Sequence, residues 1–432
     1  MSAGDTIFAI ASGAGRAAIA VMRLSGPLCR DALAALCSNR VPEARRAGLR
    51  RLRDADGAVL DQAMVLWMPG PGTYTGEDAA EFFIHGGRAV ADGLAMALVR
   101  LGLRPAEAGE FTRRAFLNGR LDLVEAEAVH DLIAAETEAQ RRQALRQLDG
   151  ELGRVYREWS DRLRFMLAQQ EALIDFPDED LPPEVEAELA ATLLSLRSEI
   201  AAHLNDAHRG EKLREGLVFA IAGPPNVGKS SLINALAERD VAIVSALPGT
   251  TRDVLETRVV LGGVPVTLLD TAGLRETTDT IEAEGVRRAL ARAEDADLVI
   301  EVTDSPDVMA GEFTHLHRIH VANKSDLGRP SSPGAIRISA LTGEGLDGLR
   351  DRLAAAARGL TETSGPPPLT RARHRAALRD ALDRLDAAAE TALPELRGED
   401  LRLALRALGR ITGHVGVEDI LDTLFRQFCI GK

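Results

Sequence analysis

Residues 223–230 read GPPNVGKS and lie between an apolar run and a helical run. Gly223, four further residues and then Gly228, Lys229 and Ser230 match the phosphate-binding loop, whose backbone N–H groups surround phosphate oxygens. In such a loop the lysine reaches the β- and γ-phosphates and the serine hydroxyl ligates Mg²⁺. The spacing therefore predicts binding of a nucleoside triphosphate with its metal, and Lys229 as a catalytic residue.

Three further motifs follow in the order found in GTPases. DTAG at 270–273 follows the apolar run VTLL, where its aspartate can hold Mg²⁺ through water. NKSD at 323–326 ends with Asp326, which can accept hydrogen bonds from guanine N1–H and the exocyclic amine; adenine lacks this arrangement. SAL at 339–341 fits the loop that closes over the base. Together the motifs predict a GTPase of the translation-factor-like class.

The predicted GTP-binding residues are Asn226, Val227, Gly228, Lys229, Ser230, Ser231, Ser245, Ala246, Leu247, Pro248, Gly249, Thr250, Thr251, Asp270, Thr271, Ala272, Gly273, Asn323, Lys324, Ser325, Asp326, Ser339, Ala340 and Leu341.

The residue that orients the attacking water is not evident from these motifs. Leu274 stands where Ras-like enzymes have glutamine, so another group must place the water. The downstream carboxylates are candidates, although for any one of them a solvated surface charge is the simpler interpretation; they are Glu276, Asp279, Glu282 and Glu284. The side-chain carbonyl of Asn226 can hold a monovalent cation beside the phosphates, in place of an arginine finger.

These motifs need a sheet with helices around it, and the chain has the pattern for one. Residues 215–364 alternate apolar strands with helical runs, which predicts an α/β domain with a parallel sheet. Residues 1–118 mix short apolar runs with Gly/Pro turns and predict an α+β domain. Residues 119–214 and 365–432 are helical in pattern. The fold class is therefore multidomain, with the α/β P-loop domain inserted into an all-α domain.

The helical segments contain two predicted apolar faces and one predicted linker. An apolar face at spacings of three and four predicts a helix through Leu189, Leu193, Leu196, Ile200 and Leu204, and a later helical face is expected through Leu378, Leu382, Leu385 and Leu393. The segment TETSGPPPLT at 361–370 is a linker by composition.

Composition limits the class of protein. The net charge of −13 argues against a protein that simply wraps nucleic acid. Three scattered cysteines, no apolar run of membrane length and no leader pattern predict a cytoplasmic protein without a membrane span. The segment RVPEARRAGLRRLRD at 40–54 holds six arginines and can face RNA, but a solvated loop is the simpler interpretation.

Three stretches together resemble one family. They are AGEFTRRAFLNGRLDLVEAEAVHDLI, the GTPase motifs from GPPNVGKSSLINAL to DTAGLRE, and the terminal FCIGK, which contains Cys429. They are similar to the MnmE (TrmE) family of tRNA-modification GTPases, and the resemblance covers essentially the whole chain.

The resemblance implies a function and its partners. It implies a K⁺-activated GTPase whose first domain binds folate and forms a homodimer. With the FAD-binding protein MnmG (GidA), in a heterotetramer, such an enzyme adds a carboxymethylaminomethyl or aminomethyl group to C5 of the wobble uridine of certain tRNAs. The one-carbon unit comes from 5-formyl- or methylene-tetrahydrofolate. Which tRNAs are used, which amine is the donor and how GTP turnover is coupled stay open.

The resemblance also assigns roles by position. It implies catalytic roles for Cys429 and, as the water-orienting residue, for Glu282. For K⁺ it implies Asn226 with oxygens around Ser245, Leu247 and Thr250; for Mg²⁺, Ser230 and Thr251; for folate, Arg23, Glu81, Arg120 and Lys432. Arg120 is a departure, because the family often has lysine there.

Cys429 decides between two classes of function. A regulatory or ribosome-assembly GTPase would explain the four GTPase motifs equally well, but it leaves Cys429 and the first domain without a task. A thiol on a frayed tail is a weak nucleophile at pH 7. We therefore expect FCIGK to fold toward the folate pocket of the first domain, its own or its dimer mate's, with Phe425, Phe428 and Ile430 as apolar anchors.

Overall fold

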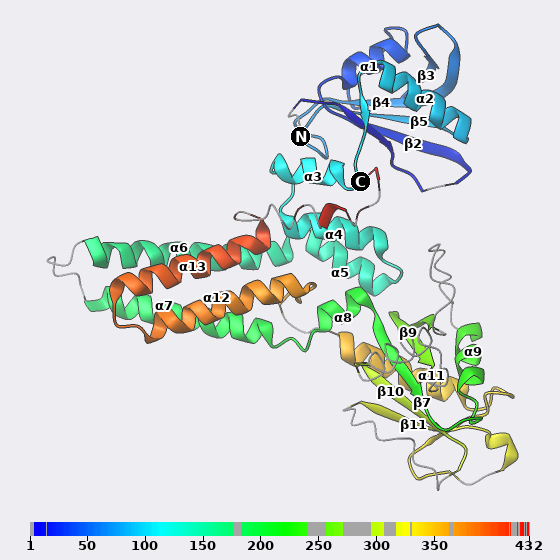
Figure 1. The fold of residues 1–432 in the computed structure, drawn as a ribbon, viewed down its shortest axis with the longest axis vertical. Helices are drawn as coiled ribbons and strands as arrows, with labels where there is room; N and C mark the ends of the chain where they lie inside the picture. The colour runs from blue at the N-terminus through cyan, green and yellow to red at the C-terminus, as the bar shows by residue number, and fades with distance from the viewer. Residues whose placement is uncertain are drawn as a thin grey trace, which may run out of the picture. The chain divides into compact units, whose positions relative to one another are not determined.

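The computed structural model describes residues 4–13, 15–175, 183–239, 256–270, 295–305, 317–328, 331–362, 366–413, 415, 421, 424–426, 428 and 430–431. The chain divides into two compact units (Figure 1). The first contains Met1–His130, Leu148–Ser160 and Arg406–Lys432, and the second contains Asp131–Gln147 and Asp161–Leu405.

The first unit is built around a mixed six-stranded sheet in the order β3-β4-β5-β2-β1-β6. All pairs are antiparallel except β1 with β6. The strands are β1 (Ile7–Ile10), β2 (Ala17–Ser25), β3 (Gly48–Arg53), β4 (Val59–Met68), β5 (Ala79–Gly86) and β6 (Arg104–Pro105). Their helices are α1 (Cys29–Leu36), α2 (Arg88–Arg100) and α3 (Glu110–Leu117), followed by α4 (Leu123–Ala134).

Helices α1 and α2 cover one face of this sheet. Met22, Leu24 and Phe82 are buried in one cluster with Leu33 of α1 and Leu94 of α2. Because successive strand residues point to opposite faces, the residues between these lie on the other face. Arg23 and Glu81 are directly opposite each other in the β2–β5 pairing, so both belong to this second face. We call it the open face, although Phe111 of α3 covers it over Ile7 and Ala9 of β1.

A bundle of long helices lies mainly in the second unit, although the start of α6 and the end of α13 belong to the first. They are α5 (Glu138–Leu148), α6 (Glu151–Asp175), α7 (Pro183–Leu204), α12 (Ala372–Glu390) and α13 (Pro394–Thr412). Figure 1 shows α6, α7, α12 and α13 side by side. Ion pairs join α6 to α7 (Arg162–Glu199), α7 to α12 (Arg197–Asp386) and α6 to α13 (Arg402–Glu171).

The predicted apolar faces of this bundle are mostly confirmed. Leu189, Leu193, Leu196 and Ile200 are buried on α7, and Leu378 and Leu385 are buried on α12. Leu393 is a wrong prediction, because α12 ends at Glu390 and the Leu393 side chain is 57% exposed. Pro394 explains the difference, since the residue before a proline is disfavoured in the helical conformation.

The second unit also contains a six-stranded sheet in the order β12-β11-β10-β7-β9-β8. All pairs are parallel except β8 with β9. Its strands are β7 (Leu217–Ala222), β8 (Glu256–Leu261), β9 (Val264–Asp270), β10 (Leu298–Thr303), β11 (Arg318–Ala322) and β12 (Ile336–Arg337). The described helices beside it are α9 (Lys229–Arg239), the short η2 (Ser325–Leu327) and α11 (Leu346–Thr361).

The chain enters and leaves this α/β part through two segments that contact each other. The incoming segment contains α8 (Arg209–Glu215), and the outgoing segment ends at α12. The buried guanidinium of Arg375 donates to Leu204 O (2.7 Å) and to the Asp206 carboxylate (2.6 Å). Leu369 N donates to the other Asp206 oxygen (3.3 Å). Asp206 of the incoming segment is therefore bonded to both Leu369 and Arg375 of the outgoing segment.

The outgoing segment was expected to be a linker by composition, but its end is part of the packed structure. Leu369 and Thr370 are fully buried. Arg214 of α8 donates from Nε to Thr370 O (2.8 Å), and Gln140 of α5 donates to Arg214 O (3.1 Å). Backbone groups that are buried must be hydrogen-bonded, and α8 and α5 supply the partners.

The multidomain class with α+β, helical and α/β parts is confirmed, whereas the boundaries predicted at residues 118, 214 and 364 stay predictions. Among the described helices, none combines the length and apolar character needed to cross a bilayer.

Candidate functional site

The segment between β7 and α9 has the conformation of a phosphate-binding loop. Gly223 has φ +149°, and a Cβ there would lie 2.1 Å from Val302 O. Gly228 has φ +95°, and a Cβ there would lie 2.4 Å from Asn323 Nδ2. Side chains are excluded at both positions by conformation and by space. The exposed Asn226 between them is left-handed (φ 63°), a conformation that asparagine tolerates.

Lys229 and Ser230 stand at the start of α9, where a helix N-terminus favours anions. The buried Lys229 ammonium donates to Gly223 O (2.8 Å) and Pro224 O (2.9 Å), so it lies across the loop. Ser230 Oγ donates to Asp270 Oδ2 (2.7 Å) at the end of β9. This brings together a hydroxyl and a carboxylate, the oxygen ligands that Mg²⁺ prefers.

The NKSD segment is attached to the same loop. Asn323 Nδ2 donates to Val227 O (2.8 Å), while Asn323 Oδ1 accepts from Ala340 N (3.0 Å). Lys324 donates to Asn226 O (2.8 Å) and pairs with Asp304 (2.9 Å). Asn323 therefore fixes the SAL loop relative to the phosphate loop through one side chain. Asp326 is exposed on η2.

The described part of the chain does not include every predicted site residue. Ser231 is exposed on α9, Ser325 donates to Glu344 (3.0 Å), Ser339 is buried and Leu341 is 87% exposed. The predicted residues outside the described part are Ser245, Ala246, Leu247, Pro248, Gly249, Thr250, Thr251, Thr271, Ala272, Gly273, Glu282, Cys429 and Lys432, and so are the acidic candidates Glu276, Asp279 and Glu284.

A second group of predicted residues meets on the open face of the first sheet. Arg23 Nε donates to Glu81 Oε1 (2.9 Å), and both side chains keep part of their surface exposed. The Arg23 guanidinium carbon lies 6.0 Å from the Tyr74 ring centre and 5.9 Å from that of Phe111. The exposed Arg120 follows α3, and its Cγ lies 3.3 Å from the position that a Cβ on Gly76 would take. The loop from Thr73 to Glu77 thus contacts both arginines.

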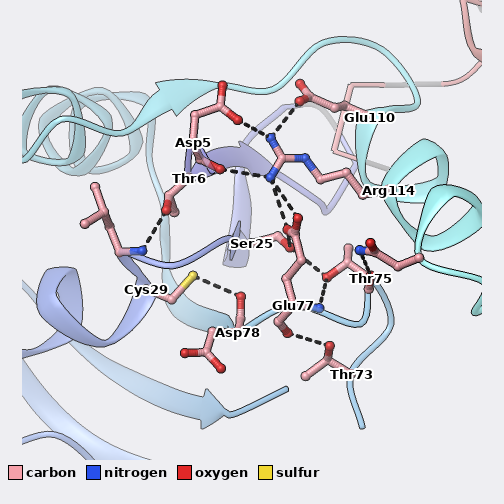
Figure 2. A network of polar contacts seen from close by, with 12 residues as sticks. Asp5, Thr6, Ser25, Cys29, Thr73, Thr75, Glu77, Asp78, Glu110 and Arg114 are labelled. Atoms are coloured by element: carbon pink, nitrogen blue, oxygen red, sulfur yellow. Dashed lines mark hydrogen bonds and ion pairs between the residues drawn. The ribbon is translucent and has the colours of Figure 1, made fainter. Parts of the chain in front are cut away.

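An ion-pair network holds this loop (Figure 2). Arg114 of α3 pairs with Asp5 (2.7 Å), Glu110 (3.0 Å) and Glu77 (3.1 Å). Glu77 also accepts from Ser25 Oγ (2.6 Å), whose oxygen lies 2.7 Å from Thr75 Oγ1. The network was not predicted, although Glu110 and Arg114 are four residues apart on a helix, the spacing of an ion pair.

The described tail residues pack within the first unit, while the expected approach of the tail to the folate pocket stays a prediction. Phe425 and Phe428 are buried in a cluster with Leu123 and Ala126 of α4, and the Phe428 ring lies 5.0 Å from that of His130. Ile430 forms an antiparallel bridge with Ala108. Of the predicted anchors, Phe425 and Phe428 thus pack on α4, whereas Ile430 reaches residue 108 and keeps 65% of its surface exposed.

Two glycines permit this approach of backbone to backbone. Gly431 has φ +102°, and a Cβ there would lie 2.1 Å from Ile10 O. Gly109 has φ +67°, and a Cβ there would lie 2.7 Å from Phe425 O. Gly431, the glycine of FCIGK, is thus required where the tail backbone contacts Ile10 of β1.

Comparisons with known proteins agree with this architecture. The family model "MnmE helical domain" matches residues 123–429, and "GTP-binding protein TrmE N-terminus" matches residues 6–120. The "tRNA modification GTPase MnmE" of Gluconacetobacter diazotrophicus is 62% identical over 434 residues, covering 99% of this chain and 98% of the relative. That of Granulibacter bethesdensis is 59% identical, covering 99% of both. The chain belongs to the MnmE family of tRNA modification GTPases.

Among solved structures, the G domain of the T. maritima FeoB iron transporter is 28% identical, covering 33% of this chain and 98% of that chain with a TM-score of 0.22. The MnmE assignment rests on the family models and the full-length relatives. The predicted resemblance is thereby confirmed.

The two described cysteines of this MnmE chain are poor nucleophiles. Cys29 and Cys37 are buried, and Cys29 Sγ donates to Asp78 O (3.3 Å). Burial raises the pKa of the Cys29 thiol to about 12 and that of the Cys37 thiol to about 11. Since the thiolate is the reactive form, neither thiol is reactive near neutral pH.

Glu110→Gln is expected to loosen α3, with the largest effect at neutral pH. Burial alone raises the pKa of Glu110, but hydrogen bonds from Arg104, Glu107 N and Arg114 outweigh it and leave the pKa lowered. A lowered folded pKa stabilises the fold above the unfolded pKa of about 4.5 and ceases to do so as the pH falls through the folded value. At pH 7 the loss should be about 2 kcal/mol, or about 30-fold faster hydrogen exchange of α3 amides.

Glu138→Gln is the control, because Glu138 pairs with Arg141 on an exposed helical surface. It should change exchange of α3 little. A Glu110→Gln effect that grows as the pH falls would contradict the assignment.

Proposed function

We propose that this MnmE-family protein is a K⁺-activated GTPase that modifies tRNA together with an FAD-binding partner. In the proposed reaction, a carboxymethylaminomethyl or aminomethyl group is added to C5 of the wobble uridine, and a tetrahydrofolate supplies the one-carbon unit. The observation that carries the proposal is the docking of the tail around Cys429 on the unit that contains the Arg23–Glu81 pair. A GTPase that only switches has no use for this arrangement.

The side chains of the first unit fit a folate. Its glutamate carboxylates suit guanidinium partners, and Arg23 and Arg120 are both accessible. The Glu81 carboxylate can accept from pterin N–H groups, and Tyr74 and Phe111 offer aromatic surface beside Arg23. We propose Arg23, Glu81, Arg120 and Lys432 as folate contacts. The bound folate would supply the one-carbon unit, while these residues orient it toward the tail.

The α/β part fits GTP with Mg²⁺ and K⁺. Ser230, already adjacent to Asp270, would hold Mg²⁺ together with Thr251. The Asn226 side chain, exposed on the phosphate loop, would hold K⁺ together with oxygens around Ser245, Leu247 and Thr250. Lys229 would offset phosphate charge, and Glu282 would orient the attacking water.

GTP hydrolysis is expected to be at least about tenfold faster in KCl than in NaCl, because a fixed cation beside the phosphates stabilises the charge that develops in the transition state. Na⁺ is smaller and fits a cage of K⁺ dimensions poorly. Asn226→Ala should remove most of the difference, whereas Asn234→Ala, an exposed substitution on α9, should preserve it. Phosphate release in matched salts is the measurement, and equal wild-type rates would exclude the K⁺ site.

We also propose that the protein forms a homodimer. The heterotetramer with MnmG, the tRNA substrate and a cytoplasmic location belong to the same proposal.

The test is a reconstituted reaction. The protein, the flavoprotein partner, GTP, a folate one-carbon donor, an amine and a tRNA with an unmodified wobble uridine are combined, and the nucleosides are analysed by mass spectrometry. The modified uridine should appear only when all components are present. GTP turnover without any modified uridine would favour the alternative, a regulatory or ribosome-assembly GTPase.

A further inference from the structure

The edge of the first sheet carries a run of arginines with little opposing charge. Strand β3 is the end strand of the sheet and pairs with β4 alone. The strand and the loop before it hold six arginines, which we call the arginine edge: Arg40, Arg45, Arg46, Arg50, Arg51 and Arg53. They lie in a chain whose net charge is −13.

Three of the six arginines of the arginine edge are held by backbone carbonyls and not by carboxylates. Arg45 donates to Gly72 O (3.0 Å), Arg50 to Arg40 O (2.5 Å) and Leu49 O (2.8 Å), and Arg53 to Gly57 O (2.7 Å). A carbonyl orients a guanidinium without cancelling its charge. Within the described chain, Arg46–Glu43 is the single ion pair of these six residues, and it is exposed.

Several arginines elsewhere in the protein have a different environment. Arg104, Arg114, Arg162 and Arg375 each pair with carboxylates at 3.0 Å or less. Nearby acidic groups are also engaged: Asp54 accepts from the backbone of its own turn, and Asp56 faces Arg100. The arginine edge therefore keeps its positive charge available to a partner.

The arginine edge lies on the same sheet as the proposed folate contacts Arg23 and Glu81. Arg51 is opposite Gln62 in the β3–β4 pairing, two residues from Met64, so it lies on the open face that also carries Arg23 and Glu81. Arg45 donates to Gly72 O, at the start of the loop that contains Tyr74. Like charge along the edge also opposes pairing of two such edges, which argues against a second copy as the partner.

We propose that the arginine edge binds the phosphate backbone of the tRNA that this enzyme modifies, an inference that rests on the proposed function. Arginine suits phosphate because its planar fork can donate two parallel hydrogen bonds. Arg46 and Arg51 are the accessible members with the fewest contacts to the fold: Arg46 has its exposed pair with Glu43, and the described residues offer Arg51 no hydrogen-bond or ion-pair partner.

The test compares two double variants of the full-length protein. Arg46→Gln/Arg51→Gln removes two charges from the arginine edge. Arg30→Gln/Arg88→Gln removes two exposed charges from α1 and α2, which cover the other face of the same sheet. Binding of an unmodified tRNA transcript with a wobble uridine is measured by fluorescence anisotropy between 50 and 300 mM KCl.

The arginine-edge variant should bind at least about tenfold more weakly near 0.1 M salt, and the slope of log K against log salt should fall by about 1.4–1.8, which corresponds to two lost phosphate contacts. The control variant should match the wild type. GTP hydrolysis and oligomeric state should be unchanged in both variants.

Three other results would contradict the proposal, and a fourth would contradict the proposed function. Equal losses in the two variants would mean a diffuse charge effect and would overturn the proposal, as would wild-type affinity in the arginine-edge variant. A variant that becomes monomeric while it keeps its tRNA affinity would assign the arginine edge to the dimer. Absence of tRNA binding by the wild type would contradict the proposed function itself.

Discussion

Cys429→Ser is expected to abolish tRNA modification while GTP hydrolysis continues at nearly the wild-type rate. A serine hydroxyl has the shape of the thiol but is not ionised near pH 7, so it cannot replace a thiolate. The GTPase motifs are built on the sheet of the second unit, and the tail packs on the first. Modified uridine is measured by mass spectrometry, and phosphate release is measured on the same samples.

Gly431→Ala is a companion variant that keeps the thiol but disturbs its position. A Cβ on Gly431 would lie 2.1 Å from Ile10 O, so the tail must move. Modification should fall strongly, while labelling of Cys429 by a thiol reagent at pH 8 should become faster. Cys29 and Cys37 will not obscure this labelling, because burial raises both pKa values to about 11 or higher.

Normal modification by Cys429→Ser would show that the thiol is not catalytic. Normal modification by Gly431→Ala together with slow labelling would show that docking of the tail is not needed.

Asp326→Asn is expected to weaken GTP binding by roughly 2–4 kcal/mol, which is about 30- to 1000-fold in affinity. The amide replaces an acceptor of two hydrogen bonds by a group that presents an N–H to the guanine donors. Xanthosine triphosphate should bind better than to the wild type, because its C2 carbonyl can accept from the new amide. Affinities for both nucleotides follow from fluorescence competition.

Asp351→Asn is the matched control, since Asp351 is exposed on α11 of the same α/β part. It should leave both affinities unchanged. If Asp326→Asn bound GTP with wild-type affinity, the NKSD segment would not form the base site.

The nucleotide site was predictable because its residues are close in sequence to the ends of strands. In a parallel sheet, the carboxyl ends of strands meet at one edge, so Ser230 after β7 and Asp270 at the end of β9 had to be neighbours. The side-chain link of Asn323 to Val227 and Ala340 was not predictable, because it depends on how three loops approach one another.

The spacing of apolar residues predicted where helices lie, but not where they end or which distant residues they contact. The apolar face of α7 follows directly from the spacing of Leu189, Leu193 and Leu196, whereas Leu393 fits the same spacing but lies outside a helix because Pro394 follows. The ion pairs of Arg114 with Asp5 and Glu77 join positions 109 and 37 residues apart. Such pairs follow from tertiary structure, and no short-range pattern contains them.

The contact between the incoming and outgoing segments has a consequence for how the α/β part can be exchanged. Asp206 is bonded to Leu369 and Arg375, so the chain returns to nearly the point at which it left the helices. A domain whose ends lie this close can be gained or lost without separating the helices that flank it. The α/β part can thus be removed or replaced as one unit, while the pairing of α7 with α12 through Arg197 and Asp386 stays intact.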